Sequence, residues 1–148
     1  MYHKKRNVII PAVHVLLFRG DHVFLIRRFN TGYLDGSYSV VAGHVDSREP
    51  VLSAARREAE EEAGLKISAS ALRMVHVMNR HTPGETLERV DFFVQASVWD
   101  GEPRILEPDK CDEMRWFPTR DLPHNLIPYI GFAILQTLAG VYYSEFGW

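Results

Sequence analysis

The chain has 148 residues, the size of one ordinary domain, and residues 1–148 are therefore predicted to form a single domain with its own core. Hydrophobic residues make up 46% and charged residues 24%, as in average globular proteins. Seventeen basic and nineteen acidic residues give a formal net charge of −2, which argues against a broad electrostatic contact with nucleic acid or with a membrane surface.

Cysteine use and hydropathy bear on the compartment. Cys111 is the single cysteine, so an intramolecular disulfide is impossible, as is usual in a reducing compartment. No apolar stretch reaches the roughly 18 residues that a membrane span needs. We therefore expect a cytoplasmic protein without a membrane partner, and we expect Cys111 to be a small core residue and not a nucleophile.

Segments rich in β-branched, aliphatic and aromatic residues between turn signals predict strands. These segments are residues 8–18, 22–28, 38–42, 72–78, 88–99 and 113–117. The Gly20-Asp21 turn between the first two segments predicts a β-hairpin. Stretches rich in Gly, Asn, Asp or Pro predict loops. These stretches are residues 30–38, 44–49, 82–84 and 102–112.

Two segments predict helices. Pro50 suits the first turn of a helix over 51–63, and Gly64 suits its C-terminal end because glycine readily adopts the left-handed conformation. Residues 128–139 begin with proline and predict a second helix. The aromatic tail, 142–148, is expected to pack on the domain or to contribute to a homodimer contact. Strands and helices alternate without a βαβ rhythm, which predicts a mixed sheet covered by helices.

The most informative stretch is the acidic end of the first helix. Residues three and four apart share a helix face, so Glu58, Glu61 and Glu62 are predicted to lie together, whereas Glu60 points elsewhere and can pair with Arg56. Three carboxylates this close repel one another unless they are protonated or bind a metal. Hard oxygen ligands favour Mg²⁺, with Mn²⁺ as a substitute. The alternative for such a run taken alone is a solvated acidic face.

The surrounding residues favour the metal site. Residues 43–65 read GHVDSREPVLSAARREAEEEAGL and match the pattern G-x5-E-x7-R-E-U-x-E-E-x-G-U, in which U is apolar. This pattern is the signature of the Nudix hydrolases, and the chain resembles that family. Ala59 is smaller than the bulky aliphatic residue usual at the first apolar position, which we expect to affect packing and not chemistry.

The resemblance implies an α/β/α sandwich around a mixed sheet with helices on both faces. It also implies Mg²⁺-dependent cleavage of a diphosphate bond by water. By position, Glu58, Glu61 and Glu62 would be metal ligands, with Glu58 and Glu61 counted as catalytic, and the Gly43 carbonyl would add a further ligand. By the same resemblance, Glu49 and Arg57 would have a structural role and brace the loop against the helix.

The identity of the general base stays open between a helix glutamate and a residue outside the helix. Residues 101–108, GEPRILEP, resemble the stretch after the long strand in MutT-type members, where a glutamate four residues after the proline lies at the metal site. Glu107 holds that place and is the candidate. The alternative is an ordinary loop carboxylate.

Substrate contacts are predicted from residues near the expected cleft. Only one of Arg27 and Arg28 can point inward, because side chains alternate along a strand, and we assign Arg28 to the substrate. Tyr33 would cover the substrate, or it would only pack against its own loop. Asp112 and Trp116 resemble base-facing residues of enzymes that sanitise oxidised purine triphosphates, although Trp116 is equally suited to the core. His14, His76 and His81 receive no role.

The sequence thus predicts a small MutT-like pyrophosphohydrolase acting on nucleoside triphosphates or related small nucleotides, without stable nucleic-acid binding. The alternative enzymes are nucleotide-sugar, dinucleotide or RNA 5′-end pyrophosphohydrolases. The alternative outside enzymes is a non-catalytic Nudix module that binds a ligand, although such modules usually lose glutamates that this chain keeps.

Overall fold

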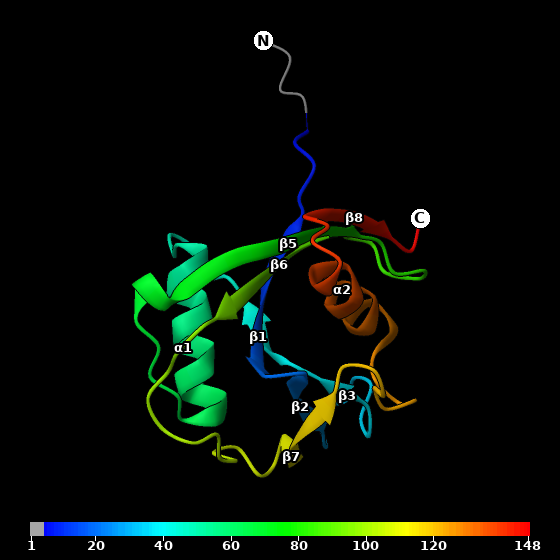
Figure 1. The fold of residues 1–148 in the computed structure, drawn as a ribbon. Coiled ribbons are helices and arrows are strands. Elements are labelled where there is room, and N and C mark those ends of the chain that lie inside the picture. The colour runs from blue at the N-terminus through cyan, green and yellow to red at the C-terminus, as the bar shows by residue number, and fades with distance from the viewer. Residues whose placement is uncertain (1–4) are drawn as a thin grey trace.

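The computed structural model describes residues 5–148, and the first four residues of the predicted domain lie outside this range. Within it, eight strands and two α-helices follow one another along the chain (Figure 1). They are β1 (Ile10–Arg19), β2 (His22–Arg28), β3 (Tyr38–Ser39), β4 (Val41–His44), α1 (Val51–Ala63), β5 (Leu72–Arg80), β6 (Arg89–Ala96), β7 (Cys111–Pro118), α2 (Pro128–Leu138) and β8 (Tyr143–Phe146). A 3-10 turn, η1 (Ala69–Ala71), precedes β5.

The strands form a mixed sheet in the order β3-β2-β1-β6-β5-β8, with β4 joined to β1 and β7 joined to β2. β1 and β6 run parallel, as do β5 and β8, and the other pairs are antiparallel. The predicted hairpin is present, since Phe18 pairs with Val23 and Arg19 with His22. β1 has both β4 and β6 as neighbours, so it lies at the centre of the arrangement.

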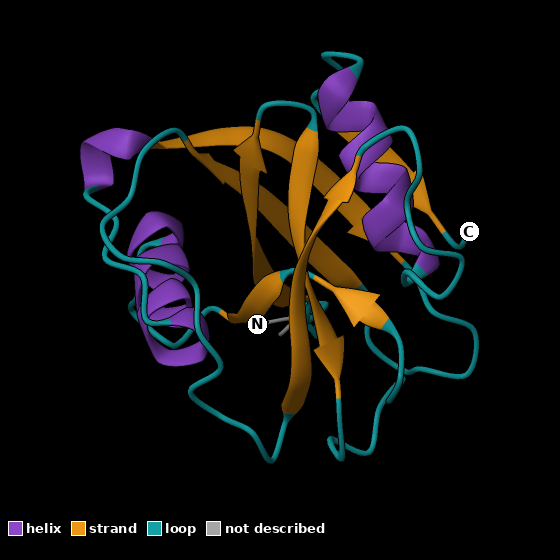
Figure 2. Ribbon diagram, turned by 60° about the horizontal axis from the view of Figure 1, so that its bottom comes forward, coloured by secondary structure: helices purple, strands orange, loops and turns teal. Residues whose placement is uncertain are grey.

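The two helices cover opposite sides of the sheet (Figure 2). Alternation along β1 explains how one strand serves both layers, because neighbouring side chains point to opposite faces. Val13, Val15 and Leu17 pack with buried alanines of α1, whereas Leu16 packs with Ile130 and Ile134 of α2. The buried alanines of α1 are Ala54, Ala55, Ala59 and Ala63. The predicted sandwich with helices on both faces is therefore confirmed.

The bounds of most predicted strands shift by one or two residues, and two predicted strands differ more. Residues 38–42 are not one strand: β3 pairs with β2 and β4 pairs with β1, so the chain changes partner at Val40. The strand predicted over 88–99 ends at Ala96, because the Ser97 N–H donates to the carbonyl of Ala71 and leaves the ladder. The helices over 51–63 and 128–138 agree with the prediction to within one residue.

The aromatic tail, residues 142–148, packs on the rest of the chain. Packing on the domain was one of the two expectations for this segment. β8 pairs in parallel with β5, and the indole N–H of Trp148 donates to the carbonyl of Asn79 (3.1 Å). The buried His76 ring contacts the carbonyl of Val141 and the hydroxyl of Ser144, both at 2.7 Å. In the part of the chain that the structure describes, neither helix has the length and hydropathy that crossing a membrane would require.

Candidate active site

The loop between β4 and α1 is held by one arginine. Arg57 donates from Nε and Nη2 to the two carboxylate oxygens of Glu49 (2.8 and 2.9 Å) and from Nη2 to the carbonyl of His44 (3.2 Å). Glu49 also accepts the N–H of Asp46 (3.1 Å). The hydrogen bonds from Arg57 and then from Asp46 lower the pKa of Glu49 to about 2. The glutamate therefore stays ionised and ties the loop to the helix.

The ends of α1 follow from backbone chemistry. Pro50 is extended (φ −63°, ψ 144°) and Val51 begins the helix. Gly64 ends it in the left-handed conformation (φ 69°), where its N–H donates to the carbonyl of Glu60 and the N–H of Leu65 donates to that of Ala59. Such a glycine closure satisfies carbonyls that have no partner inside the helix. The helix length is thereby fixed, and with it the positions of its glutamates.

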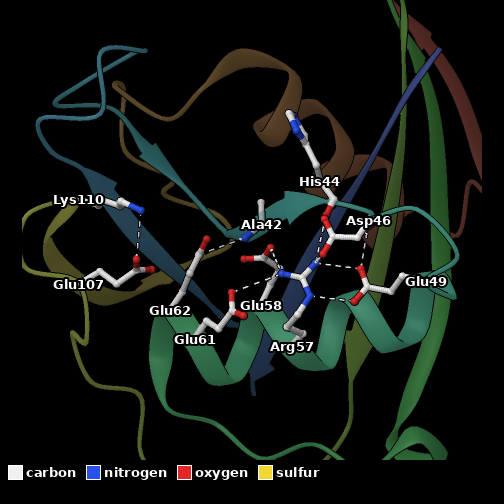
Figure 3. A network of polar contacts seen from close by, with 10 residues as sticks. All are labelled: Ala42, His44, Asp46, Glu49, Arg57, Glu58, Glu61, Glu62, Glu107 and Lys110. Atoms are coloured by element: carbon white, nitrogen blue, oxygen red, sulfur yellow. Dashed lines mark hydrogen bonds and ion pairs between the residues drawn. The ribbon is translucent and has the colours of Figure 1, made fainter. Parts of the chain in front are cut away.

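Glu58, Glu61 and Glu62 lie on the side of α1 that faces β4 and the loop at 107–110 (Figure 3). Glu58 accepts from Nη1 of Arg57 (2.8 Å), and Glu61 accepts from the same nitrogen (3.4 Å). Glu62 accepts the N–H of Ala42 (3.3 Å). On another part of the helix, Arg56 donates to the carbonyl of Ile67 (2.8 Å) in place of the ion pair expected with Glu60.

Two of these carboxylates, Glu58 and Glu62, are partly buried and close enough to influence each other. Burial raises the pKa of Glu62 well above its usual value, and the charges of Glu58 and Glu107 raise it further. Burial likewise raises the pKa of Glu58, although the neighbouring Arg57 opposes that shift. Burial is the main cause of both shifts, and repulsion from neighbouring carboxylates adds to it, so negative charge is unfavourable here. A cation between the two carboxylates would remove this penalty.

The residues fit a divalent cation by their chemistry and by the space that Gly43 leaves. A Cβ atom on Gly43 would overlap the carboxylate of Glu58, so the missing side chain makes room for that group. Mg²⁺ and Mn²⁺ prefer such carboxylate oxygens. Among the described residues, no three side chains of His, Cys, Asp or Glu converge on one point as they stand, and Arg57 engages both Glu58 and Glu61. A cation held by all three glutamates would need Glu58 and Glu61 to turn away from Arg57.

A cavity of about 410 Å³ lies beside the acidic face. It is lined by Glu62 of α1, by Arg28 of β2 and by the loop residues Glu107 and Lys110. Lys110 pairs with Glu107 (Nζ–Oε2 3.3 Å), as Figure 3 shows. The structure thus brings Glu107 to the same cavity as the helix glutamate Glu62, together with two basic groups. Cys111 also lines this cavity, and burial raises the pKa of its thiol.

A second cavity of about 220 Å³ shares Arg28 with the first. Tyr33 and Gly43 line it as well. Arg28 donates from Nε to the carbonyl of Tyr33 (2.7 Å) and from Nη2 to the hydroxyl of Thr31 (3.0 Å), which fixes the loop at the mouth of both cavities. Arg28 and Tyr33, two of the residues assigned to the substrate from the sequence, therefore lie next to open space.

The other two predicted substrate residues line neither of these cavities. Asp112 accepts from Nε and Nη2 of Arg27 (2.7 and 3.2 Å). Trp116 packs on the α1 side of the sheet, with the Arg19 guanidinium 4.5 Å from its ring centroid and Phe24 at 5.2 Å. Their assignment to substrate binding stays a prediction.

Sequence reasoning missed a buried polar group at the second cavity. His14, Arg80 and Tyr129 line it, and Asp91 joins the first two by hydrogen bonds. His14 and Asp91 are polar residues inside otherwise apolar strand segments, and this interruption is the one indication of the network that the sequence contains. A single polar residue in a strand does not identify its partner, however, because His14 and Asp91 are 77 residues apart.

Comparison with known proteins identifies the family. A family model described as the NUDIX domain matches residues 8–134. The chain belongs to the Nudix family. Nudix hydrolases act on nucleotide-derived substrates and generally use divalent metal ions. The family predicted from residues 43–65 is thereby confirmed.

Individual relatives agree with this membership. The structure of a MutT Nudix hydrolase from Burkholderia pseudomallei is 28% identical and superposes with a TM-score of 0.80, covering 88% of this chain and 98% of that one. A MutT protein from Methanosarcina mazei Go1 has the same fold (15% identity, TM-score 0.76, covering 92% and 97%). The NAD-capped RNA hydrolase NudC of Pseudomonas syringae pv. tomato is 30% identical over 115 residues, 78% of this chain and 38% of that protein. The chain thus spans about two fifths of the length of the curated relatives it matches.

Proposed function

We propose that this protein is a Mg²⁺-dependent pyrophosphohydrolase that cleaves a diphosphate bond in nucleoside triphosphates or related small nucleotides. The observation that supports this most is the pair of partly buried carboxylates, Glu58 and Glu62, on the Nudix helix. Burial and neighbouring carboxylates raise the pKa of both groups, although Arg57 opposes the shift of Glu58. An adjoining cavity of about 410 Å³ contains the further carboxylate of Glu107 and two basic side chains, Arg28 and Lys110.

Each group has a task in this proposal. Glu58, Glu61 and Glu62 would hold the cation, which when bound neutralises diphosphate oxygens and lowers the pKa of a water. Glu107 accepts a proton from the attacking water, for which the carboxylate must lie within hydrogen-bond reach. Arg28 and Lys110 offer donors to phosphate oxygens, and positioning of this kind supplies much of the catalysis in phosphoryl transfer. In nucleoside triphosphates the products would be the monophosphate and pyrophosphate.

A second candidate substrate class comes from the relatives. Proteins 26–30% identical to this chain are named NAD-capped RNA hydrolases, which favours the diphosphate of NAD or of an NAD-capped RNA end. This candidate requires the same cation and the same cleavage. The two candidate substrate classes differ in the group attached to the other end of the diphosphate. Comparing cleavage of nucleoside triphosphates with cleavage of NAD and NAD-capped RNA separates them.

A substrate panel tests the proposal. The purified protein is incubated with normal and oxidised nucleoside triphosphates, a nucleotide sugar, NAD and an NAD-capped oligonucleotide, with Mg²⁺ or with excess EDTA, and products are separated by ion-exchange chromatography. We expect cleavage of at least one compound with Mg²⁺ and none with EDTA. Binding without cleavage of any compound, in Mg²⁺ and in Mn²⁺, would overturn the proposal and favour a non-catalytic ligand-binding module.

The role of Glu107 has its own test and a matched control. Glu107→Gln removes the candidate base and is expected to lower kcat at least about tenfold. Glu102→Gln changes a glutamate of the same segment whose side chain is 79% exposed and pairs only weakly with Arg19 (3.5 Å). It should leave kcat unchanged. Equal rates for the two variants would assign Glu107 to the loop and not to the chemistry.

A further inference from the structure

The second cavity contains a charged network that the cation site does not use. Asp91 of β6 is fully buried, and its carboxylate accepts from Nε and Nη2 of Arg80 (2.6 and 3.2 Å) and from Nε2 of His14 (3.0 Å). The side chains of Arg80 and His14 are each only 4% exposed. Burying three such groups is costly unless each is paired, so the network is a built feature of the fold.

The network determines which nitrogen of His14 is protonated. Burial by itself raises the pKa of Asp91, yet the hydrogen bonds from His14 and Arg80 outweigh it, and the pKa lies below its usual value. An ionised carboxylate can only accept hydrogen bonds. His14 must therefore donate to Asp91 through Nε2–H. In the neutral ring this tautomer leaves Nδ1 as a hydrogen-bond acceptor.

That acceptor has no partner. Nδ1 of His14 is buried and makes no hydrogen bond within the described part of the chain. Buried polar atoms are nearly always paired, and an unpaired one calls for an explanation. His14 is one of the residues that line the second cavity, and a molecule bound there could supply the missing donor once small shifts of the lining expose Nδ1.

The walls of the cavity carry aromatic and guanidinium groups. Tyr129 packs edge-on to His14 (6.0 Å between centroids), and the Arg80 guanidinium lies 3.8 Å from the Tyr129 ring centroid. At the mouth, the Arg28 guanidinium lies 5.5 Å from the Tyr33 ring centroid. Aromatic and guanidinium planes are the surfaces on which heterocyclic bases stack. Gly43 also lines this cavity, so a ring held here would lie beside the proposed cation site.

We propose that His14 is a specificity residue, whose Nδ1 accepts a hydrogen bond from an N–H group of the heterocyclic base of the substrate. Arg80 and Asp91 act through His14 by holding its tautomer and its orientation. The inference rests on the proposed function for the identity of the substrate as a nucleotide. The inference adds to the proposed function the chemical feature of the base that the protein selects.

Two isosteric variants separate the two ring nitrogens. His14→Gln keeps an amide nitrogen near the Nε2 position, so it can still donate to Asp91, but it has no atom at the Nδ1 position. His14→Asn places its amide near Nδ1 and gives up the bond to Asp91. His14→Gln is therefore the test variant, and its thermal midpoint shows whether the bond to Asp91 survives.

The substrates are matched in the same way. The best-cleaved nucleotide of the panel is compared with an analogue whose base has no N–H group: the purine riboside nucleotide for a purine, or the 2-pyrimidinone nucleotide for a pyrimidine. We expect wild type to prefer the parent compound at least about tenfold in kcat/KM, because the analogue leaves Nδ1 unpaired. His14→Gln should lose this preference and treat both compounds alike. A purely structural role for His14 would lower both rates equally, and a preference that persists in His14→Gln overturns the proposal.

A binding measurement covers the cases in which His14→Gln does not fold or the wild type does not turn over. The ¹⁵N resonances of the His14 ring are followed in wild type while the nucleoside monophosphates of the parent and of its analogue are added. We expect Nδ1 to shift with the parent and not with the analogue. A spectrum that no nucleotide changes, or that both change alike, overturns the proposal, whereas absence of cleavage in the panel bears on the proposed function alone.

Discussion

Breaking the buried ion pair between Arg80 and Asp91 by removing one partner is predicted to be strongly destabilising. Both side chains are almost fully buried, at 4% and 0% exposed, and two hydrogen bonds join them (2.6 and 3.2 Å). Arg80→Met would leave the Asp91 carboxylate with His14 as its remaining side-chain donor. Removing one partner of a buried pair costs about 3–5 kcal/mol. The free energy of unfolding of a typical protein is roughly 5–15 kcal/mol, so this cost is a large part of it. For a chain of this length it corresponds to a drop in Tm of roughly 6–20 °C.

A matched arginine pair provides the control. Arg27 makes the same two contacts with Asp112 (2.7 and 3.2 Å), but the side chains are 35% and 33% exposed. Solvent screens such a pair, so Arg27→Met should leave Tm nearly unchanged. Urea denaturation followed by circular dichroism gives the free energy of unfolding of both variants and of wild type. If Arg80→Met were no less stable than Arg27→Met, the argument from burial would be refuted.

Three further predictions concern the proposed cation site. Gly43→Ala places a methyl group against the Glu58 carboxylate and should weaken Mn²⁺ binding at least about tenfold by calorimetry, with an unchanged circular dichroism spectrum. Glu62→Gln removes one carboxylate of a partly buried, mutually repelling pair, so it should raise Tm without metal and abolish the rise in Tm that Mn²⁺ gives wild type. An equal rise in both proteins contradicts the site. Glu49 has a folded pKa of about 2 against a usual 4.5, so its pairing with Arg57 stabilises the fold above about pH 4.5 and this contribution is lost as the pH falls toward 2. The difference in Tm between wild type and Glu49→Gln should shrink over that range, and a difference independent of pH would refute the assignment.

Local features of the sequence were sufficient to predict the helix of the site. Pro50 and Gly64 delimit α1, and the spacing of three and four residues places Glu58 and Glu62 on one face. The small Ala59, which we expected to affect packing and not chemistry, is fully buried. Each of these inferences depends on neighbours within one or two turns, which is the range over which sequence patterns are informative.

Features that depend on distant partners were not predictable in this way. The change of strand partner at Val40 is set by where β1 and β2 lie, which residues 38–42 alone do not reveal. The pairing of the tail with β5 depends on the buried His76, whose partners are 65 and 68 residues away. The unpaired nitrogen of His14 appears only once Asp91 is in place.

The central claim is that one face of α1 holds the cation that the reaction needs. The most direct test compares Glu61→Gln with Glu60→Gln, two neighbouring glutamates with exposed side chains that lie on different faces of the helix. The measurement is kcat for the best-cleaved substrate of the panel as a function of Mg²⁺ concentration. The account predicts that Glu61→Gln lowers kcat at least about 100-fold or requires far more Mg²⁺, while Glu60→Gln stays within about twofold of wild type. Equal activity of the two variants would contradict it.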